Sequence, residues 1–222
     1  MQPESCYRHV FLDFDGVLCD SLSVAMREFN ALRAQFPALP AVSTRDDMVA
    51  VYGGSLKTCL LAWLSESEHV EFFRAHADRM AATQDELSLF SGVPALMRKL
   101  RPAGASLITS AYGDHVRCVF KRRAPDVDLG RLHAVAGKDS PGDKAEKIKR
   151  LAAEVKIPLR HCLYVGDLES DLLYCRKVPI DVALVTYGYH PRWHLEQQSA
   201  TYLADSVEEL ADLLRQHALL EA

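Results

Sequence analysis

The spacing of apolar residues divides the chain into two kinds of segment. From Ser21 to Leu89, apolar positions recur at helical intervals in one run after another, with no strand signal between the runs. Before and after this stretch, short apolar runs typical of buried strands alternate with amphipathic helices. The pattern predicts an α/β fold, in which a doubly wound, Rossmann-like parallel sheet forms the core and carries an inserted all-helical segment. We expect residues 1–20 and 90–222 to form the core domain and residues 21–89 the helical domain.

Individual elements follow from the same pattern. The core strands are expected at residues 10–12, 105–108, 132–136, 162–165 and 182–185, the last of these being the final strand. The helical segment should hold helices at residues 21–36, 56–64 and 68–82, and the third of these places on one face Val70, Phe73, Ala77 and Met80. Ser43 and Asp46 have the spacing of a capping box, which predicts a further short helix that ends at Gly53.

The composition is that of an ordinary globular protein, with 49% hydrophobic and 25% charged residues. A formal net charge of −4 argues against a general binder of nucleic acid or of anionic membranes. No apolar run approaches the roughly 18 residues of a membrane span, and the first residues lack the features of a signal peptide. We therefore expect a cytoplasmic protein. The six cysteines are scattered and include no Cys-x-x-Cys pair, which indicates reduced thiols rather than a zinc site.

The most informative residues follow the first expected strand. The apolar run Val10-Phe11-Leu12 ends on Asp13-Phe14-Asp15, and Gly16 comes next. Side chains alternate faces along a strand, so the two carboxylates can converge only where the strand ends and the chain turns, which Gly16 permits. There they repel each other and lose hydration, so each needs a cation or a shared proton. A bound divalent metal ion is the simplest answer, and an acidic turn after an edge strand is the alternative.

Two later strands also end on reactive side chains. Thr109 and Ser110 follow the second expected strand, while Asp167, with Asp171 four residues later, follows the fourth. Parallel strands place their carboxyl ends on one edge of the sheet, so these groups can meet Asp13. Carboxylates within about 4–6 Å of one another have raised pKa values unless cations intervene. Because these motifs offer only oxygen ligands, we expect the cation to be Mg²⁺.

A lysine would balance the remaining charge. Lys144 stands at the start of a strongly periodic helix expected at residues 143–155, just before the fourth strand. Lys138 and Lys147 are alternatives, because two glycines leave the reach of the intervening loop open. A lysine on an amphipathic helix is ordinarily only solvated, so position in the sequence does not decide among the three.

Together, these segments resemble the four motifs of the haloacid dehalogenase superfamily. The similar segments are Asp13-x-Asp15-Gly16 for motif one, Thr109-Ser110 at a strand end for motif two, Lys144 for the lysine of motif three, and Gly166-Asp167-x-x-x-Asp171 for motif four. All four occur in order and span nearly the whole chain. The helical insertion directly after motif one resembles the cap of the phosphoglycolate-phosphatase-like branch. Val17 stands where many members have threonine, which leaves the subfamily open.

The resemblance implies a magnesium-dependent phosphatase that hydrolyses a small phosphomonoester metabolite. Asp13 would attack phosphorus and form an aspartyl-phosphate. Asp15 would protonate the departing alkoxide and then deprotonate the attacking water. An acidic residue at position 15 favours phosphoryl transfer over cleavage of a carbon–halogen bond, because a halide leaving group needs no proton.

The resemblance also implies the binding groups. The metal ligands would be the Asp13 carboxylate, the backbone carbonyl of Asp15 and the Asp167 carboxylate, while Asp171 would bind a metal-bound water or orient the lysine. The phosphoryl oxygens would be bound by Thr109, Ser110 and Lys144.

The helical insertion would close over the site and select the leaving group. Its loop around Gly54 and Ser55, together with Lys57, could contact a polar substrate, although a plain helix–helix turn accounts for the glycines equally well. His190 and His194 have the spacing of a metal pair on a helix, but an oxygen-ligated site already exists, and we expect them to pack on the surface. The substrate and the choice between monomer and homodimer stay open.

Other functions are compatible with parts of the pattern. A β-phosphoglucomutase-like phosphomutase would pass the phosphoryl group to a sugar, but that branch usually carries a histidine in the first cap helix, where this chain has Phe29 and Asn30. A receiver-type or catalytically silent phosphate-binding module also combines aspartates, a hydroxyl group and a lysine, but a receiver is about half this length and has no helical insertion. A Rossmann-type nucleotide binder would need a glycine fingerprint that is absent.

Overall fold

The computed structural model describes residues 7–52 and 56–221. Its centre is a parallel sheet of order β5-β4-β1-β6-β7-β8. The strands are β1 His9–Leu12, β4 Ala105–Ile108, β5 Ala134–Ala136, β6 Cys162–Gly166, β7 Asp181–Val185 and β8 Tyr202–Ala204. The doubly wound α/β core is therefore as predicted. The expectation that β7 is the final strand is wrong, because the short segment β8 pairs with β7 at the edge of the sheet.

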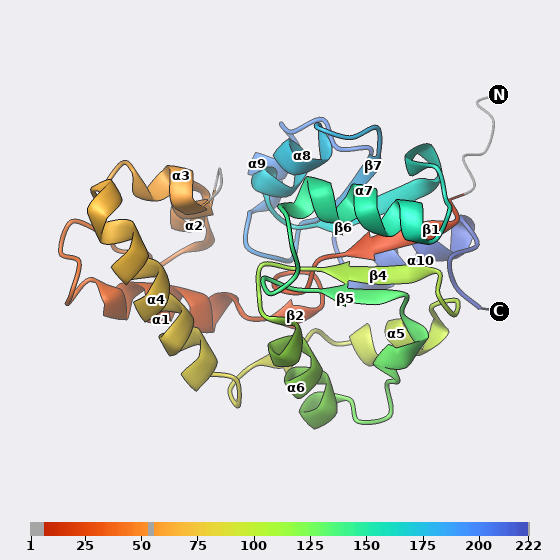
Figure 1. Cartoon of the computed structure of the whole chain (residues 1–222), viewed down its shortest axis with the longest axis horizontal. Helices are drawn as coiled ribbons and strands as arrows, with labels where there is room; N and C mark the ends of the chain where they lie inside the picture. Colours follow the sequence, from red (N-terminus) through yellow and green to blue (C-terminus); the bar gives the residue numbers. More distant parts are fainter. Residues whose placement is uncertain (1–6, 53–55, 222) are drawn as a thin grey trace.

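Helices cover both faces of the sheet (Figure 1). One face packs against α5 Val93–Lys99, α6 Gly113–Arg123 and α10 Val207–Gln216. The other packs against α7 Lys144–Glu154, α8 Glu169–Cys175 and α9 Arg192–Leu195. Two short 3₁₀ helices, η1 Leu129–Arg131 and η2 Leu159–His161, lie in the connections. Because both faces are covered, the central strands β1, β4 and β6 are buried along their whole length, as their continuous apolar runs require.

A separate group of helices extends from one end of the sheet (Figure 1). This helical insert consists of α1 Leu22–Leu32, α2 Arg45–Tyr52, α3 Leu56–Leu60 and α4 Glu66–Ala82. It has its own apolar cluster, in which Phe29, Met48 and Phe72 are fully buried. The segments that enter and leave it pair as a two-stranded antiparallel ribbon, β2 Cys19–Asp20 and β3 Ser88–Leu89. Sequence periodicity did not reveal this ribbon, because two residues are too few for an alternating pattern.

The buried face of α4 differs from the prediction. Val70 is 80% exposed, whereas His69 and Phe72 are buried. The ring of His76 stacks on that of Phe72, with centroids 5.8 Å apart. The buried face of α4 includes histidines, so a pattern that counts only apolar residues did not locate it.

The cap of α2 lies one residue later than predicted. The Asp47 carboxylate accepts hydrogen bonds from the backbone N–H groups of Ser43 and Thr44, both at 2.8 Å. Thr44 Oγ1 in turn accepts from the Asp47 N–H at 3.3 Å. The capping box is thus Thr44 with Asp47, and Asp46 is free to contact another part of the molecule.

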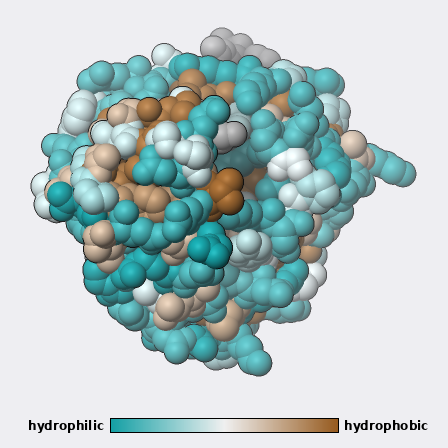
Figure 2. All heavy atoms as spheres, turned by 60° about the vertical axis from the view of Figure 1, so that its left-hand side comes forward, coloured by the Kyte–Doolittle hydropathy of each residue, from teal (hydrophilic) through white to brown (hydrophobic). Residues whose placement is uncertain are grey.

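The face that carries the helical insert is largely hydrophilic (Figure 2). Hydrophobic side chains gather on one part of it, beside a hollow in the surface. Leu61 and Val70 of the insert and Trp193 of the core are at least half exposed. Within the described residues, no helix combines the length and apolar character that crossing a membrane requires.

Candidate active site

Three neighbouring strands bring the predicted site residues to one edge of the sheet. Leu12, the last residue of β1, pairs with Leu107 of β4 and with Val165 of β6. The residues that follow these strands are Asp13, Thr109 and Asp167, and each is at most 5% exposed. The Asp13 N–H donates to the Val165 carbonyl at 2.9 Å, which continues the pairing one residue past the strand. Residues more than 150 positions apart in the sequence therefore share one site, as the parallel order predicts.

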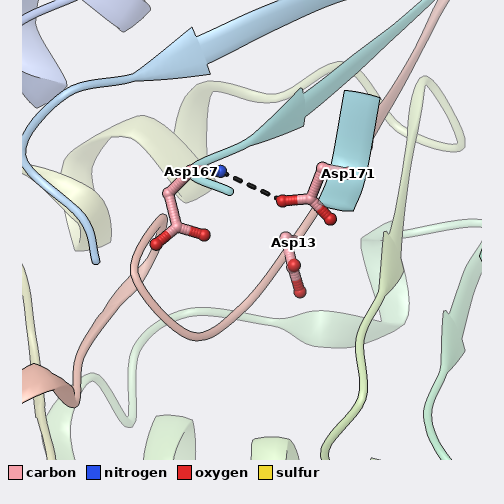
Figure 3. A group of neighbouring side chains, drawn as sticks. All are labelled: Asp13, Asp167 and Asp171. Atoms are coloured by element: carbon pink, nitrogen blue, oxygen red, sulfur yellow. Dashed lines mark hydrogen bonds between the residues drawn. The ribbon is translucent and has the colours of Figure 1, made fainter. Parts of the chain in front are cut away.

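Three carboxylates converge there. One carboxylate oxygen from each of Asp13, Asp167 and Asp171 lies within 4.8 Å of the other two, and all three residues are buried. Figure 3 shows Asp13 and Asp167 reaching this point from loops after their strands and Asp171 from a helix. The Asp171 Oδ2 atom accepts from the backbone N–H groups of Asp167 and Leu168, both at 3.2 Å, and so caps the start of α8.

Lys144 is the cation that contacts this cluster. Its Nζ atom lies 2.5 Å from Asp13 Oδ2 and 2.5 Å from Asp171 Oδ1. It is the first residue of α7, where a capping box between Asp143 and Glu146 fixes the helix start. Although burial opposes its charge, the Asp13 and Asp171 carboxylates raise the pKa of Lys144 well above its ordinary value.

The other two candidate lysines have different surroundings. Lys147 Nζ donates to the Gly137 carbonyl at 2.8 Å. Lys138 is exposed, and its Nζ lies 5.5 Å from the centroid of the Tyr112 ring. Of the three lysines considered from sequence, Lys144 is therefore the one whose ammonium group is bonded to the aspartates.

The carboxylate cluster carries more negative charge than Lys144 can balance. Burial raises the pKa of Asp13 to about 7, even though Lys144 opposes the rise. Burial, followed by the charges of Asp171 and Asp13, raises the pKa of Asp167 well above its ordinary value. These shifts mark a site that favours uptake of a further positive charge.

The cluster fits a divalent cation at Asp167. Both oxygens of Asp171 are already bonded, Oδ1 to Lys144 and to the Tyr164 hydroxyl and Oδ2 to backbone N–H groups. Asp167 Oδ2 accepts from the Tyr189 N–H at 2.7 Å. Asp167 Oδ1, by contrast, is buried and has no hydrogen-bond partner in the structure. An unpaired buried carboxylate oxygen beside a second carboxylate is the donor set that Mg²⁺ prefers.

Two glycines make room for Asp167. Gly16 has a φ angle of +74°, and a Cβ atom there would lie 1.9 Å from Asp167 Oδ2. A Cβ atom on Gly188 would lie 2.4 Å from the Asp167 Cβ. Any other residue at either position would displace the carboxylate, so the glycine after the two aspartates serves Asp167 as well as the turn.

The hydroxyl groups after β4 have different environments. Thr109 is 1% exposed, and its Oγ1 accepts from the Ala111 N–H at 3.0 Å. Ser110 is exposed. Asp15 is partly exposed, and its Oδ1 accepts a hydrogen bond from the Ser21 hydroxyl at 2.7 Å. Burial raises the pKa of Asp15, and the bond from Ser21 opposes the rise.

Other predicted residues lie outside the described part of the chain or in surroundings that differ from the prediction. Gly54, Ser55 and the side chain of Lys57 are outside the part of the chain that the structure describes. The expectation that His190 packs on the surface is wrong, because it is fully buried and its Nδ1 accepts from the Glu169 N–H at 3.2 Å. His194 Nε2 lies 3.0 Å from Glu169 Oε2.

Sequence reasoning missed the contacts that dock the helical insert on the core. Arg45, the first residue of α2, donates through Nη2 to the carbonyls of Thr186, Gly188 and His190, at 2.5, 2.6 and 3.0 Å. The Trp193 indole N–H donates to Asp46 Oδ1 at 2.9 Å. Partners more than 140 positions apart leave no local sequence signal.

Comparison with known structures places this geometry in context. A predicted phosphatase from Clostridium acetobutylicum is 20% identical, covers 95% of this chain and 99% of its own, and superposes with a TM-score of 0.75. A predicted phosphoglycolate phosphatase from Haemophilus somnus is 20% identical, with 96% and 99% coverage and a TM-score of 0.73. A mutant of CbbY from Rhodobacter sphaeroides, in complex with xylulose-1,5-bisphosphate, is 17% identical, with 90% and 94% coverage and a TM-score of 0.67. At these identities the likeness establishes the fold.

Sequence comparison establishes the family. Among curated proteins, none is significantly similar to this chain. The family model of the haloacid dehalogenase-like hydrolases matches residues 7–178, which include the aspartates after β1 and β6, the hydroxyl residues after β4 and the lysine of α7. The chain therefore belongs to the haloacid dehalogenase-like hydrolases.

Proposed function

We propose that this hydrolase is a magnesium-dependent phosphatase that acts on a small phosphomonoester metabolite through an aspartyl-phosphate intermediate. The observation that carries the proposal is the buried cluster of Asp13, Asp167 and Asp171. Asp13 and Asp171 share Lys144, whereas Asp167 Oδ1 has no hydrogen-bond partner. The names of the similar structures, a predicted phosphatase and a predicted phosphoglycolate phosphatase, support the same reaction class.

Asp13 is the proposed nucleophile. Its Oδ1 accepts from the Phe14 N–H at 2.7 Å and its Oδ2 from Lys144, so the carboxylate is held in one orientation. A bond forms between an Asp13 oxygen and phosphorus while the bond from phosphorus to the ester oxygen breaks. The Lys144 ammonium opposes the rise that burial causes in the pKa of Asp13, and it thereby favours the ionised carboxylate, which is the form that can attack.

Asp15 is the proposed proton carrier. It gives its proton to the departing alkoxide and afterwards takes one from the water that attacks the aspartyl-phosphate, so the proton balance closes over one turnover. Such transfers contribute on the order of 10²–10⁴ in rate. The raised pKa of Asp15 suits the first half of this cycle, in which the carboxyl group must start protonated.

The Asp13 and Asp167 carboxylates and the backbone carbonyl of Asp15 would hold Mg²⁺, with Asp171 orienting Lys144. When bound, the ion supplies positive charge that lessens repulsion between Asp13 and an anionic substrate and polarises the phosphoryl oxygens. Thr109, Ser110 and Lys144 provide the hydrogen bonds and charge that this chain itself directs at those oxygens.

The helical insert is proposed to act as a cap domain, with residues 1–20 and 90–222 as the catalytic core. Arg45 of the insert donates to the Gly188 carbonyl, next to the Tyr189 N–H that donates to Asp167, and Asp46 accepts from Trp193 of α9. These contacts support a position of the insert beside the site. We propose that it excludes water during phosphoryl transfer and selects the leaving group. Transfer to water rather than to a second sugar hydroxyl is favoured because the first helix of the insert, α1, contains no histidine.

A panel of phosphorylated metabolites assayed for phosphate release, with Mg²⁺ and with a chelator, tests the proposal. We expect release from at least one small phosphomonoester that requires Mg²⁺ and disappears in the Asp13→Asn variant. Metal-independent release, or no release from any ester in the panel, would overturn it. Analysis of the products separates hydrolysis from transfer to a second substrate molecule.

A further inference from the structure

A chain of hydroxyl groups leads away from Asp15. The Ser21 Oγ atom lies 2.7 Å from Asp15 Oδ1 and 3.0 Å from the Tyr189 hydroxyl oxygen. Ser21 is fully buried and Tyr189 is 6% exposed. Solvent therefore has little access to these two hydroxyl groups, and each must find its partners within the protein.

The direction of the bonds follows from the number of protons. A serine hydroxyl has one hydrogen, and Ser21 gives it to Asp15 Oδ1. The Tyr189 hydroxyl must therefore be the donor to Ser21. Burial, and then the Asp15 carboxylate, raises the pKa of Tyr189, so the tyrosine keeps the proton that it donates. The hydroxyl oxygen of a protonated carboxyl group is a weaker acceptor than its carbonyl oxygen, so the bond from Ser21 to Oδ1 favours Oδ2 as the protonated atom.

Tyr189 also connects the two halves of the molecule. Its backbone N–H donates to Asp167 Oδ2 at 2.7 Å. Its ring belongs to the apolar cluster of the helical insert and forms a T-shaped pair with the Tyr52 ring of α2, with centroids 5.7 Å apart. Arg45 of the same helix binds the carbonyls on both sides of it, those of Gly188 and His190. A change in the docking of the insert would therefore alter the contacts that position the Tyr189 side chain.

We propose that Ser21 and Tyr189 are positioning residues for proton transfer by Asp15, with Tyr189 acting through Ser21. The pair fixes which Asp15 oxygen holds the proton, and it makes that arrangement depend on a docked helical insert. This inference rests on the proposed phosphatase function and adds to it a link between the insert and the acid.

The leaving group provides the test. The value of kcat/KM reports the steps up to departure of the leaving group. An alkoxide needs a proton at that step, whereas p-nitrophenolate leaves readily without one. For the Tyr189→Phe variant we expect kcat/KM to fall about tenfold for an alkyl phosphate that the wild type hydrolyses and less than about twofold for p-nitrophenyl phosphate. The Mg²⁺ concentration for half-maximal activity should not change, because the backbone N–H to Asp167 is retained.

Tyr187→Phe is the matched control. Tyr187 lies on the same loop, and its hydroxyl donates to the Val17 carbonyl at 3.1 Å rather than to a carboxylate or to Ser21. Its loss should leave the ratio of the two kcat/KM values as in the wild type. An equal loss on both substrates in Tyr189→Phe, or no loss on either, would overturn the proposal. No turnover by the wild type on any phosphoester would instead overturn the proposed function itself.

A second variant tests the order of the chain. Ser21→Ala removes the bond to Asp15 directly and should reduce alkyl phosphate turnover at least as much as Tyr189→Phe. In the double variant, Tyr189→Phe should add less than about a twofold further loss, because its effect passes through Ser21. Full multiplication of the two single effects would show that Tyr189 acts independently and would contradict the proposed chain.

Discussion

A buried ionisable side chain lies at each end of strand β1, because His9 is its first residue and Asp13 follows its last, and the two behave differently. At its start, His9 is fully buried and its Nε2 lies 3.0 Å from Ser106 Oγ. Burial, and then the neighbouring His133, lowers the pKa of His9 to about 4, so the imidazole is neutral. At the other end, Asp13 is also buried, but Lys144 contacts it directly. Burial opposes charge at both ends, but at the carboxyl end Lys144 opposes this effect on Asp13, whereas the partner of His9 is an uncharged hydroxyl group.

This difference indicates that the two ends of β1 have different roles. A neutral imidazole bonded to a serine hydroxyl is compatible with a closed core. A carboxylate beside two others, with a lysine on one side and an unpaired Asp167 oxygen on the other, needs a further cation for full compensation. We infer that the amino end of the sheet is built for stability and that the carboxyl end retains charge for function.

Replacing Asp13, at the carboxyl end of β1, should have the largest effect, a loss of phosphatase activity. Asp13→Asn should lower phosphatase activity by a factor on the order of 10³ or more, because an amide cannot form the acyl phosphate. The fold should persist, since the change removes a buried charge. His9→Gln, at the other end of the strand, should keep activity within about twofold of the wild type. Retention of a tenth of the turnover by Asp13→Asn, measured as phosphate release, would remove Asp13 as nucleophile.

Removing the Lys144 ammonium group should have the next largest effect, in this case on the free energy of unfolding. Lys144→Met leaves Asp13 and Asp171 buried without their partner and should reduce the free energy of unfolding by about 3–5 kcal/mol, measured by urea denaturation without Mg²⁺. Lys147→Met, on the same helix, removes a single bond to a carbonyl and should cost only about 1 kcal/mol. Similar losses in the two variants would show that the carboxylates do not depend on Lys144.

Lowering the pH should reduce stability through His9, at the amino end of β1. The pKa of His9 in the folded protein is about 4, below the value of about 6.5 in the unfolded chain, so the unfolded state binds the proton first as pH falls. The stability that neutral His9 confers is therefore complete above about pH 6.5 and is lost as pH falls toward 4. We expect the unfolding free energy of the wild type to fall between pH 7 and pH 4.5 by more than that of His9→Gln, with a difference of at most about 3 kcal/mol.

A parallel decrease in the two proteins would show that His9 does not titrate in this way. The comparison uses two variants of one protein, so that carboxyl groups common to both contribute equally to each curve.

Mg²⁺ should stabilise the folded protein by binding at the carboxyl end of β1 and not at its amino end. At about one hundred times its dissociation constant, an ion that binds the folded state alone raises the free energy of unfolding by about 2.7 kcal/mol. We expect a Mg²⁺-dependent increase in the thermal midpoint of the wild type that a chelator reverses. The increase should disappear in Asp167→Asn and persist in His9→Gln. An undiminished response in Asp167→Asn would place the ion elsewhere.

The sequence predicted those parts of the site that depend on local signals and strand order. Asp13, Thr109 and Asp167 each follow an apolar run, and a parallel sheet brings such positions together. Lys144 was one of three candidates for the lysine that balances the carboxylates, because the reach of a glycine-containing loop cannot be judged from sequence. The structure separates them by the partner of each Nζ atom.

Long-range polar contacts and very short strands could not be predicted. The Ser21 and Tyr189 hydroxyls are 168 positions apart, and neither residue type distinguishes a positioning group from an ordinary buried hydroxyl. The buried face of α4 was wrong by one residue because its inner positions include histidine. Strand β8 has three residues, too few for a pattern of its own, and forms because β7 offers it a free edge.

Direct detection of the phosphorylated residue is the sharpest test of the proposed function. Asp15→Asn, mixed with Mg²⁺ and p-nitrophenyl phosphate, should form the aspartyl-phosphate, because this leaving group needs no acid, and should hydrolyse it slowly, because the base is missing. After acid quenching and trypsin digestion, mass spectrometry should find one phosphoryl group on the peptide of residues 9–27, at Asp13, and hydroxylamine should remove it. Release of p-nitrophenolate with no phosphoryl group on Asp13, or with the group on another residue, would contradict the proposed mechanism.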